Sequence, residues 1–348
     1  GPAAVAAVGL SGAMIGIIIM LAQSVTVGTT TLVANAFGRG DRDRAAVVAG
    51  QGLAMAVGLS VLLAGVGIPL APAVVRLMGA QGEVIGGATA YLRIISGFGF
   101  TLLLAISFAS ALRGAGDAVT PFWAMITANL VNVVLDPILI FGWFGLPALG
   151  VAGSAWATMI GRLVAATMMA HTFFVTDRGI IPLPLQPLVR EGPTSRRIVR
   201  LARAACGRLL VRNVSMLVLM RLAAGFGTAA LAAFGLCFRL QMVLFGPTMG
   251  FSMAAATLTG QNLGARDPRR ARRGGWTAAG FAVAIAAALG AVYWFGAPVI
   301  VPVFNDAPDV VRYGTSLLRW LAPTFVFLSL TMVLSFAMNG AGDTLRPM

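Results

Sequence analysis

Long apolar runs separated by short polar breaks make up the chain from end to end. The runs Thr101 to Leu112 and Gly280 to Val303 contain no charged residue. A helix of about 20 apolar residues crosses the hydrocarbon core of a bilayer. We therefore predict an all-α membrane protein of about nine transmembrane helices. Dividing the chain at its arginine-rich and Pro/Gly-rich breaks places these helices at residues 4–35, 46–71, 88–112, 119–141, 150–175, 199–224, 229–262, 275–303 and 315–338.

The composition excludes a soluble fold. Of the 348 residues, 58% are hydrophobic and 10% are charged, whereas soluble domains carry about 25% charged residues. A net charge of +14 in a soluble protein would suggest a nucleic-acid partner. Here all the basic residues are arginines, and they gather between the apolar runs. We therefore expect a surrounding lipid bilayer, no nucleic acid, and a multi-pass location in a bacterial cytoplasmic (inner) membrane.

The arginines mark alternate connections between the predicted helices. Apart from Arg76, the other connections carry almost none. Cytoplasmic loops are enriched in Lys and Arg, so the arginine-rich connections are predicted to be cytoplasmic. The first predicted helix then enters from outside, and we expect that a preceding helix is missing from this sequence. The arginine-rich segments are residues 39–44, 113–117, 177–203, 266–273 and 339–346.

An internal repeat organises the chain. A shift of 226 residues carries Gly114 to Asp117 onto Gly340 to Asp343 and aligns the two halves without a gap. Both copies have their arginine-rich loops on the same side, which predicts parallel repeats with a substrate site at their interface. The complete fold would have twelve helices in two pseudo-symmetric bundles, of which three are absent here. The predicted parts are an N-terminal lobe at 1–176, a cytoplasmic linker at 177–198 and a C-terminal lobe at 199–348.

Several motifs resemble those of the MATE (multidrug and toxic compound extrusion) transporters. The resemblance implies two six-helix lobes around a central cleft, and places this chain from the family's second helix to its tenth. It also implies export of cationic or amphipathic drug-like compounds in exchange for H+ or Na+, by alternating access. The alternatives are a lipid-linked oligosaccharide flippase of the same superfamily and a non-transporting truncated remnant. The matching segments are Ala111 to Asp117 with Thr120-Pro121, Asn129 to Pro137, Gly150 to Thr158 and Gly260 to Ala265.

Asp136 is the acid that stands out inside an apolar span. A carboxylate at the centre of a membrane helix costs about 3 kcal/mol on insertion scales, and such residues are usually functional. Asn132 lies one turn earlier on the same helix face. Their oxygens suit a small hard cation, and the carboxylate can also take a proton. Alternatively, Asp136 lies near the outer membrane edge, where water solvates it and Pro137 marks a bend.

The family resemblance favours a coupling role for Asp136 over a solvated position at the membrane edge. Members resembling the DinF branch hold such an Asp, an Asn four residues earlier, a Thr on the sixth helix and an acid on the first helix. This implies a cation or proton coupling site at Asp136, Asn132 and Thr158, without the first-helix acid. Members resembling the NorM branch use acids in helices that correspond to 199–224 and 315–338. Neither span contains Asp or Glu, so coupling is predicted in the first lobe.

Other polar residues receive structural interpretations. Arg162, Arg221 and Arg239 are expected to extend their charged ends to the membrane interface, with contacts to substrate or between the lobes as the alternative. Asp117 and Asp343 are expected to cap helices. A Walker A phosphate loop needs a lysine, and the chain has none, which argues against ATP. The two cysteines are not spaced as metal ligands are. The chain has a single histidine, and no Ser-His-Asp grouping is visible in the sequence. We expect a monomer that is not an enzyme, has no metal or cofactor, and uses H+ or Na+ only as the coupling ion.

Overall fold

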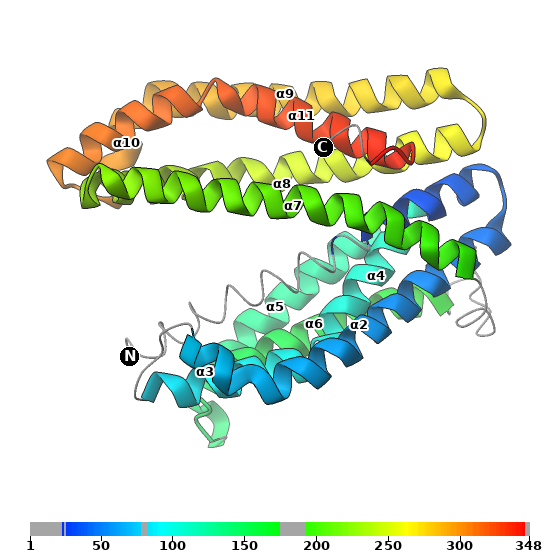
Figure 1. Cartoon of the computed structure of the whole chain (residues 1–348), viewed down its shortest axis with the longest axis horizontal. Coiled ribbons are helices and arrows are strands. Elements are labelled where there is room, and N and C mark those ends of the chain that lie inside the picture. Colours follow the sequence, from blue (N-terminus) through cyan, green and yellow to red (C-terminus); the bar gives the residue numbers. More distant parts are fainter. Residues whose placement is uncertain (1–22, 24–25, 78–82, 146, 175–191, 345–348) are drawn as a thin grey trace. The chain divides into compact units, whose positions relative to one another are not determined.

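The computed structural model describes residue 23 and residues 26–77, 83–145, 147–174 and 192–344 (Figure 1). Within these ranges the chain is helical and contains no strand, which confirms the all-α prediction. Residues 26–38 are helical. They are followed by α2 (Arg42–Leu77), α3 (Glu83–Gly97), α4 (Phe100–Gly114), α5 (Val119–Phe141), the short 3-10 helix η1 (Trp143–Gly145), α6 (Val151–Phe174), α7 (Gly192–Gly225), α8 (Thr228–Gly264), α9 (Pro268–Phe304), α10 (Pro308–Leu321) and α11 (Thr324–Gly340).

Length and apolar composition show which of the described helices can cross a membrane. Four helices qualify singly, namely α2, α5, α8 and α9, and the count rises to six if each of two bent pairs is one span. The predicted spans at 150–175 and 199–224 are occupied by the helices α6 and α7. Most of the first predicted span, 4–35, lies outside the described residues. The fold is that of a multi-pass helical membrane protein.

The bent pairs occupy equivalent places in the two halves. The axis changes direction by 43° between α3 and α4 and by 48° between α10 and α11. The first break contains Gly99, and the second contains Pro323, whose ring restricts the preceding residue and favours a helix end there. In both breaks a threonine hydroxyl donates to a carbonyl three residues back: Thr101 to Phe98 at 2.9 Å and Thr324 to Leu321 at 2.6 Å. The predicted spans 88–112 and 315–338 are therefore bent.

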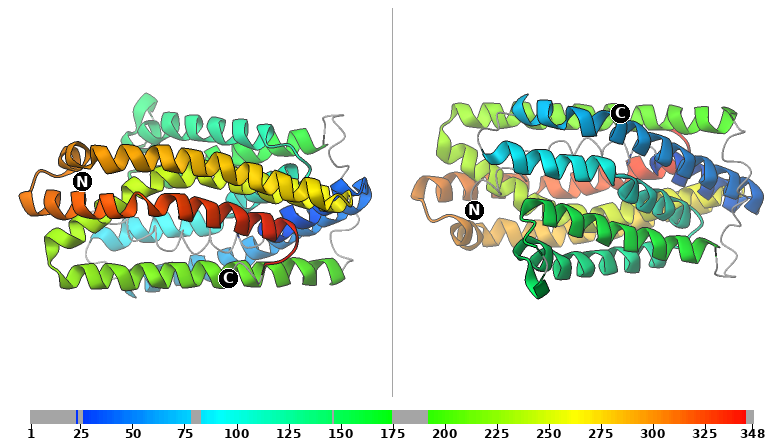
Figure 2. Two further views of the ribbon diagram at one scale, coloured as in Figure 1. Left: turned by 90° about the horizontal axis from the view of Figure 1, so that it is seen from above. Right: turned by 90° about the horizontal axis from the view of Figure 1, so that it is seen from below.

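The chain divides into two compact units, Gly1–Arg203 and Ala204–Met348. In the first unit, α5 and α6 pack closely along their length (Figure 2). Small residues allow this approach. A Cβ atom on Gly161 would lie 2.6 Å from the Ala128 carbonyl oxygen, and one on Gly153 would collide with the Leu139 carbonyl. These contacts fix the axial register of α6 against α5.

The second unit packs α8, α9 and the α10–α11 pair side by side (Figure 2). Its core includes Cys237, Leu244, Tyr293 and Phe325. The Tyr293 hydroxyl donates to the Leu240 carbonyl at 3.0 Å, so the buried phenol has a partner. The rings of Tyr293 and Phe325 meet edge to face with centroids 5.9 Å apart. This arrangement joins α8, α9 and α11 into one bundle.

The 226-residue repeat is visible in the turns. Asp41 accepts a hydrogen bond from the Arg44 amide at 2.9 Å, and Asp267 accepts one from the Arg270 amide at 2.8 Å. Gly40 has φ 76°, and its counterpart Arg266 has φ 62°, a left-handed conformation that is uncommon for a residue with a side chain. The two halves are therefore built from the same local structures.

Both ends of α5 are capped. Asp117 accepts hydrogen bonds from the Val119 and Thr120 amides, both at 2.9 Å, which confirms the predicted cap at the start of α5. At the other end of this helix, Gly142 adopts φ 75° and its amide donates to the Ile138 carbonyl. For Asp343, the residues that a cap would serve lie largely outside the described part of the chain. The α5 helix is thus held at both ends.

Candidate coupling site in the first unit

Asp136 lies in the last third of α5, and the helix continues through Pro137 to Phe141. The carboxylate is half-buried and lies near the Ser154 side chain of α6. Its Oδ1 atom is nevertheless buried without a hydrogen-bond partner among the described residues. Leaving a buried acceptor unsatisfied costs about 1–3 kcal/mol, and more when it is charged. The geometry therefore leaves one carboxylate oxygen available to a proton or a small cation.

Asn132 and Thr158 meet across the α5–α6 interface. The Asn132 Nδ2 donates to Thr158 Oγ1 at 3.4 Å, a long bond, and Thr158 Oγ1 donates to the Ser154 carbonyl at 2.9 Å. Asn132 and Asp136 are four residues apart on α5, and Ser154 and Thr158 are four apart on α6. Residues at this spacing share a helix face. The structure thus brings the three sequence-predicted residues onto two facing stripes, together with Ser154.

Tyr91 of α3 is a further member of this cluster, and the sequence analysis did not single it out. Its side chain is 6% exposed and packs against Ala155 and Met159 of α6. The phenol lies close enough to interact electrostatically with both Arg162 and Asp136. A tyrosine within an apolar helix is usually read as core packing, so no pattern in the sequence marks this role. Only the packing of α3 against α6 reveals it.

Arg162 is a partly buried charged residue on α6. It stands at the middle of α6, and its Nη1 atom is buried without a hydrogen-bond partner among the described residues. One end of its guanidinium group therefore lies inside the protein. Side chains on a helix lean toward its N-terminus, which directs Arg162 toward the level of Thr158, and the packed helices cover it there. Arg221 and Arg239 are exposed.

The cluster offers oxygen donors of three kinds: a carboxylate, an amide and hydroxyls. Such hard ligands suit H+ or a small alkali cation rather than a soft metal. No group of three or more His, Cys, Asp or Glu residues that could hold a metal ion occurs in the described ranges. Arg162 lies one helical turn after Thr158 and interacts electrostatically with Tyr91. The arrangement therefore suits reversible binding of a single monovalent cation at Asp136.

Two repeated helical units with a buried, incompletely satisfied charge cluster inside one of them define a multi-pass membrane transporter. The family model named MatE matches residues 1–138 and 204–348, and the chain belongs to this family. Membership confirms the prediction of a transporter rather than an enzyme.

Relatives and solved structures agree with this assignment. The chain is 25% identical over 351 residues to "Probable multidrug resistance protein NorM" of Thermotoga maritima, covering 99% of this chain and 74% of that protein. It is 30% identical over 360 residues to the protein of the same name from Bradyrhizobium diazoefficiens, covering 99% and 75%. The crystal structure of a MATE protein in the bent conformation matches with a TM-score of 0.92 at 27% identity, covering 100% of this chain and 76% of the other.

Proposed function

We propose that the protein is a secondary active antiporter that exports cationic or amphipathic compounds in exchange for H+ or Na+. The observation that carries the proposal is the Asp136 carboxylate, whose buried Oδ1 has no hydrogen-bond partner in the described structure. The relatives named as multidrug resistance proteins support the substrate class. The lobes predicted at residues 1–176 and 199–348 are the bodies that would alternate between inward and outward access.

The exchange follows from the charge of the cluster. A proton or Na+ at Asp136 neutralises a carboxylate that burial disfavours, while Asn132 and Thr158 supply neutral dipoles beside it. Loss of the ion restores the charge and the unsatisfied oxygen, which changes the packing energy of α5 against α6. An antiporter requires that substrate and ion weaken each other's binding, and the linkage is reciprocal. Asp136 is the group at which this coupling would act.

Gradient-driven transport in proteoliposomes tests the proposal. A pH gradient or a Na+ gradient should drive export of a fluorescent organic cation by the unmodified protein. Asp136→Asn keeps the shape and removes the charge, and it should lower gradient-driven export at least about tenfold, since one coupling charge is worth several kcal/mol in a buried site. Asp309→Asn, in the first turn of α10, is the matched control and should transport normally. Undiminished export by Asp136→Asn would rule out this residue as the coupling group.

A further inference from the structure

An open groove of about 740 Å³ runs between α8 and α9 in the second unit, far along the chain from Asp136. It lies at the arginine-rich end of these helices, where they are joined by the turn before Asp267. The principal lining residues are Phe251, Leu258, Arg269, Arg270, Arg273 and Phe281. Apolar side chains form its length and basic side chains form its mouth.

The walls of the groove are apolar and accessible. The rings of Phe251 and Phe281 are stacked with centroids 6.0 Å apart and an interplanar angle of 13°. Phe281 is 59% exposed and Leu258 is 41% exposed. Gly274 and the buried Ala278 also line the groove, and neither contributes a large side chain. In a bilayer these walls would face hydrocarbon.

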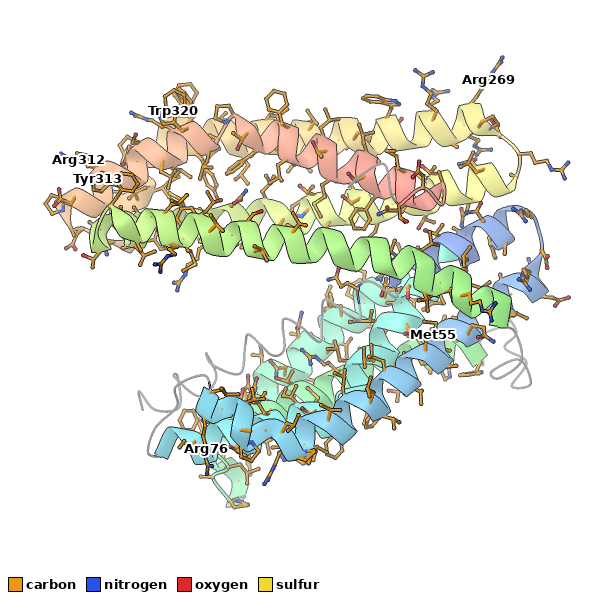
Figure 3. The ribbon with its side chains drawn as sticks, in the orientation of Figure 1. Met55, Arg76, Arg269, Arg312, Tyr313 and Trp320 are labelled. Atoms are coloured by element: carbon orange, nitrogen blue, oxygen red, sulfur yellow. The ribbon has the colours of Figure 1, made fainter. Side chains whose placement is uncertain are left out.

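The mouth carries an excess of positive charge. Arg269, Arg270 and Arg273 lie on the first two turns of α9 and are exposed; Figure 3 shows Arg269 at the end of the α8–α9 hairpin. Asp267 is the one acid among the lining residues, and its carboxylate is already engaged in capping α9. Three guanidinium groups against one carboxylate leave a net charge of +2. Guanidinium groups bind phosphate oxygens in bidentate fashion.

In the first unit, residues of α7 fill the place equivalent to this groove. The 226-residue shift places Met55 at the position of Phe281, and Met55 packs against the core cluster that contains Ile198 and Leu201. A Cβ on Gly28 would lie 3.0 Å from the Ile198 carbonyl oxygen. The counterpart of Arg269 is Asp43. The basic residues of the groove therefore belong to the second unit alone, while the counterparts of Ile198 and Leu201 would fall at positions 424 and 427, outside this sequence.

We propose that this groove binds one anionic phospholipid. Its phosphate contacts Arg269, Arg270 and Arg273, and one acyl chain lies along Phe251, Leu258 and Phe281. Arginine-rich helix ends are cytoplasmic by the charge rule, and the cytoplasmic leaflet is the one that presents anionic headgroups. A phospholipid matches both parts of the groove at once. Its charged headgroup would lie at the basic mouth, and the attached hydrocarbon tail would lie along the apolar walls.

Lipid binding to the purified, detergent-solubilised protein tests this inference. Native mass spectrometry and thermal unfolding would be followed while phosphatidylglycerol, phosphatidylcholine or inorganic phosphate is added. We expect one phosphatidylglycerol to bind at least about tenfold more tightly than phosphatidylcholine and to raise the unfolding temperature, because only the former offers the arginines an uncompensated negative charge. Arg269→Gln/Arg273→Gln should abolish the preference. Arg39→Gln/Arg42→Gln, which removes two charges near the equivalent turn of the first unit, should retain it.

A second variant tests the apolar part without changing charge. Thr277 lines the groove and is exposed, so Thr277→Trp should fill it, leave unfolding in lipid-free detergent unchanged and weaken phosphatidylglycerol binding. Equal affinity for the two lipids would overturn the proposal, as would equal stabilisation by inorganic phosphate, which would indicate an anion site only. If Thr277→Trp binds phosphatidylglycerol normally, the groove is not the lipid site. None of these outcomes depends on transport activity or on Asp136.

Discussion

At the residue scale, the first unit places two opposite charges inside an apolar bundle without pairing them fully. Asp136 keeps one buried oxygen without a partner, and Arg162 keeps one buried nitrogen without a partner, both among the described residues. The Tyr91 phenol interacts electrostatically with both charged groups. Unpaired buried charges reduce stability. Under the proposed function, this incompletely satisfied cluster is where the coupling ion would bind.

Arg162→Met is therefore expected to stabilise the protein. Methionine keeps the apolar length of the side chain and removes a charge whose burial is not fully compensated, for a gain of about 1–3 kcal/mol. Thermal unfolding in detergent should show a higher midpoint. Arg239→Met, at an exposed position, is the control and should change stability by less than about 0.5 kcal/mol. A clear loss of stability in Arg162→Met would show that Arg162 has a structural partner.

At the element scale, the site depends on how closely α5 and α6 approach. Gly161 and Gly153 leave room for the backbone of α5, and this fixes Asn132 opposite Thr158 and Asp136 opposite Ser154. The contact is set by backbone atoms, which cannot move aside as a flexible side chain can. The alignment of Asn132 with Thr158 and of Asp136 with Ser154 along the helix axes is therefore set by the packing of α5 against α6 as a whole.

Gly161→Ala should disturb this register. Its new Cβ would lie 2.6 Å from the Ala128 carbonyl oxygen, and overpacking of this kind costs about 1–3 kcal/mol. Gly280→Ala in α9 has open space around the added atom and should be neutral or slightly stabilising, because alanine favours helix more than glycine does. Unfolding temperatures compared under the same conditions would check the pair. Equal stability of the two variants would mean that α5 and α6 separate without cost.

At the scale of the whole molecule, the repeat and the helices follow from sequence far better than the site does. The predicted span 119–141 has the bounds of α5, because Asp117 and Gly142 fix both helix ends locally. The bends near Gly99 and Pro323 do not follow from the sequence pattern, since hydropathy reports apolar length and not direction. Nor could Tyr91 and Arg162 be assigned, because their environment is created by the packing of α3 and α5 against α6.

The proposed coupling is a property of the whole molecule, because ion binding and substrate binding must affect each other through the protein. The most direct measurement is the release of the coupling ion when substrate is added to the purified protein. A weakly buffered solution with a pH indicator detects H+, and radioactive sodium in equilibrium dialysis detects Na+. We predict release of about one ion per bound substrate from the unmodified protein and from Asp309→Asn, and none from Asp136→Asn, because coupling is reciprocal. Equal release from Asp136→Asn would contradict the assignment of the coupling site to this cluster.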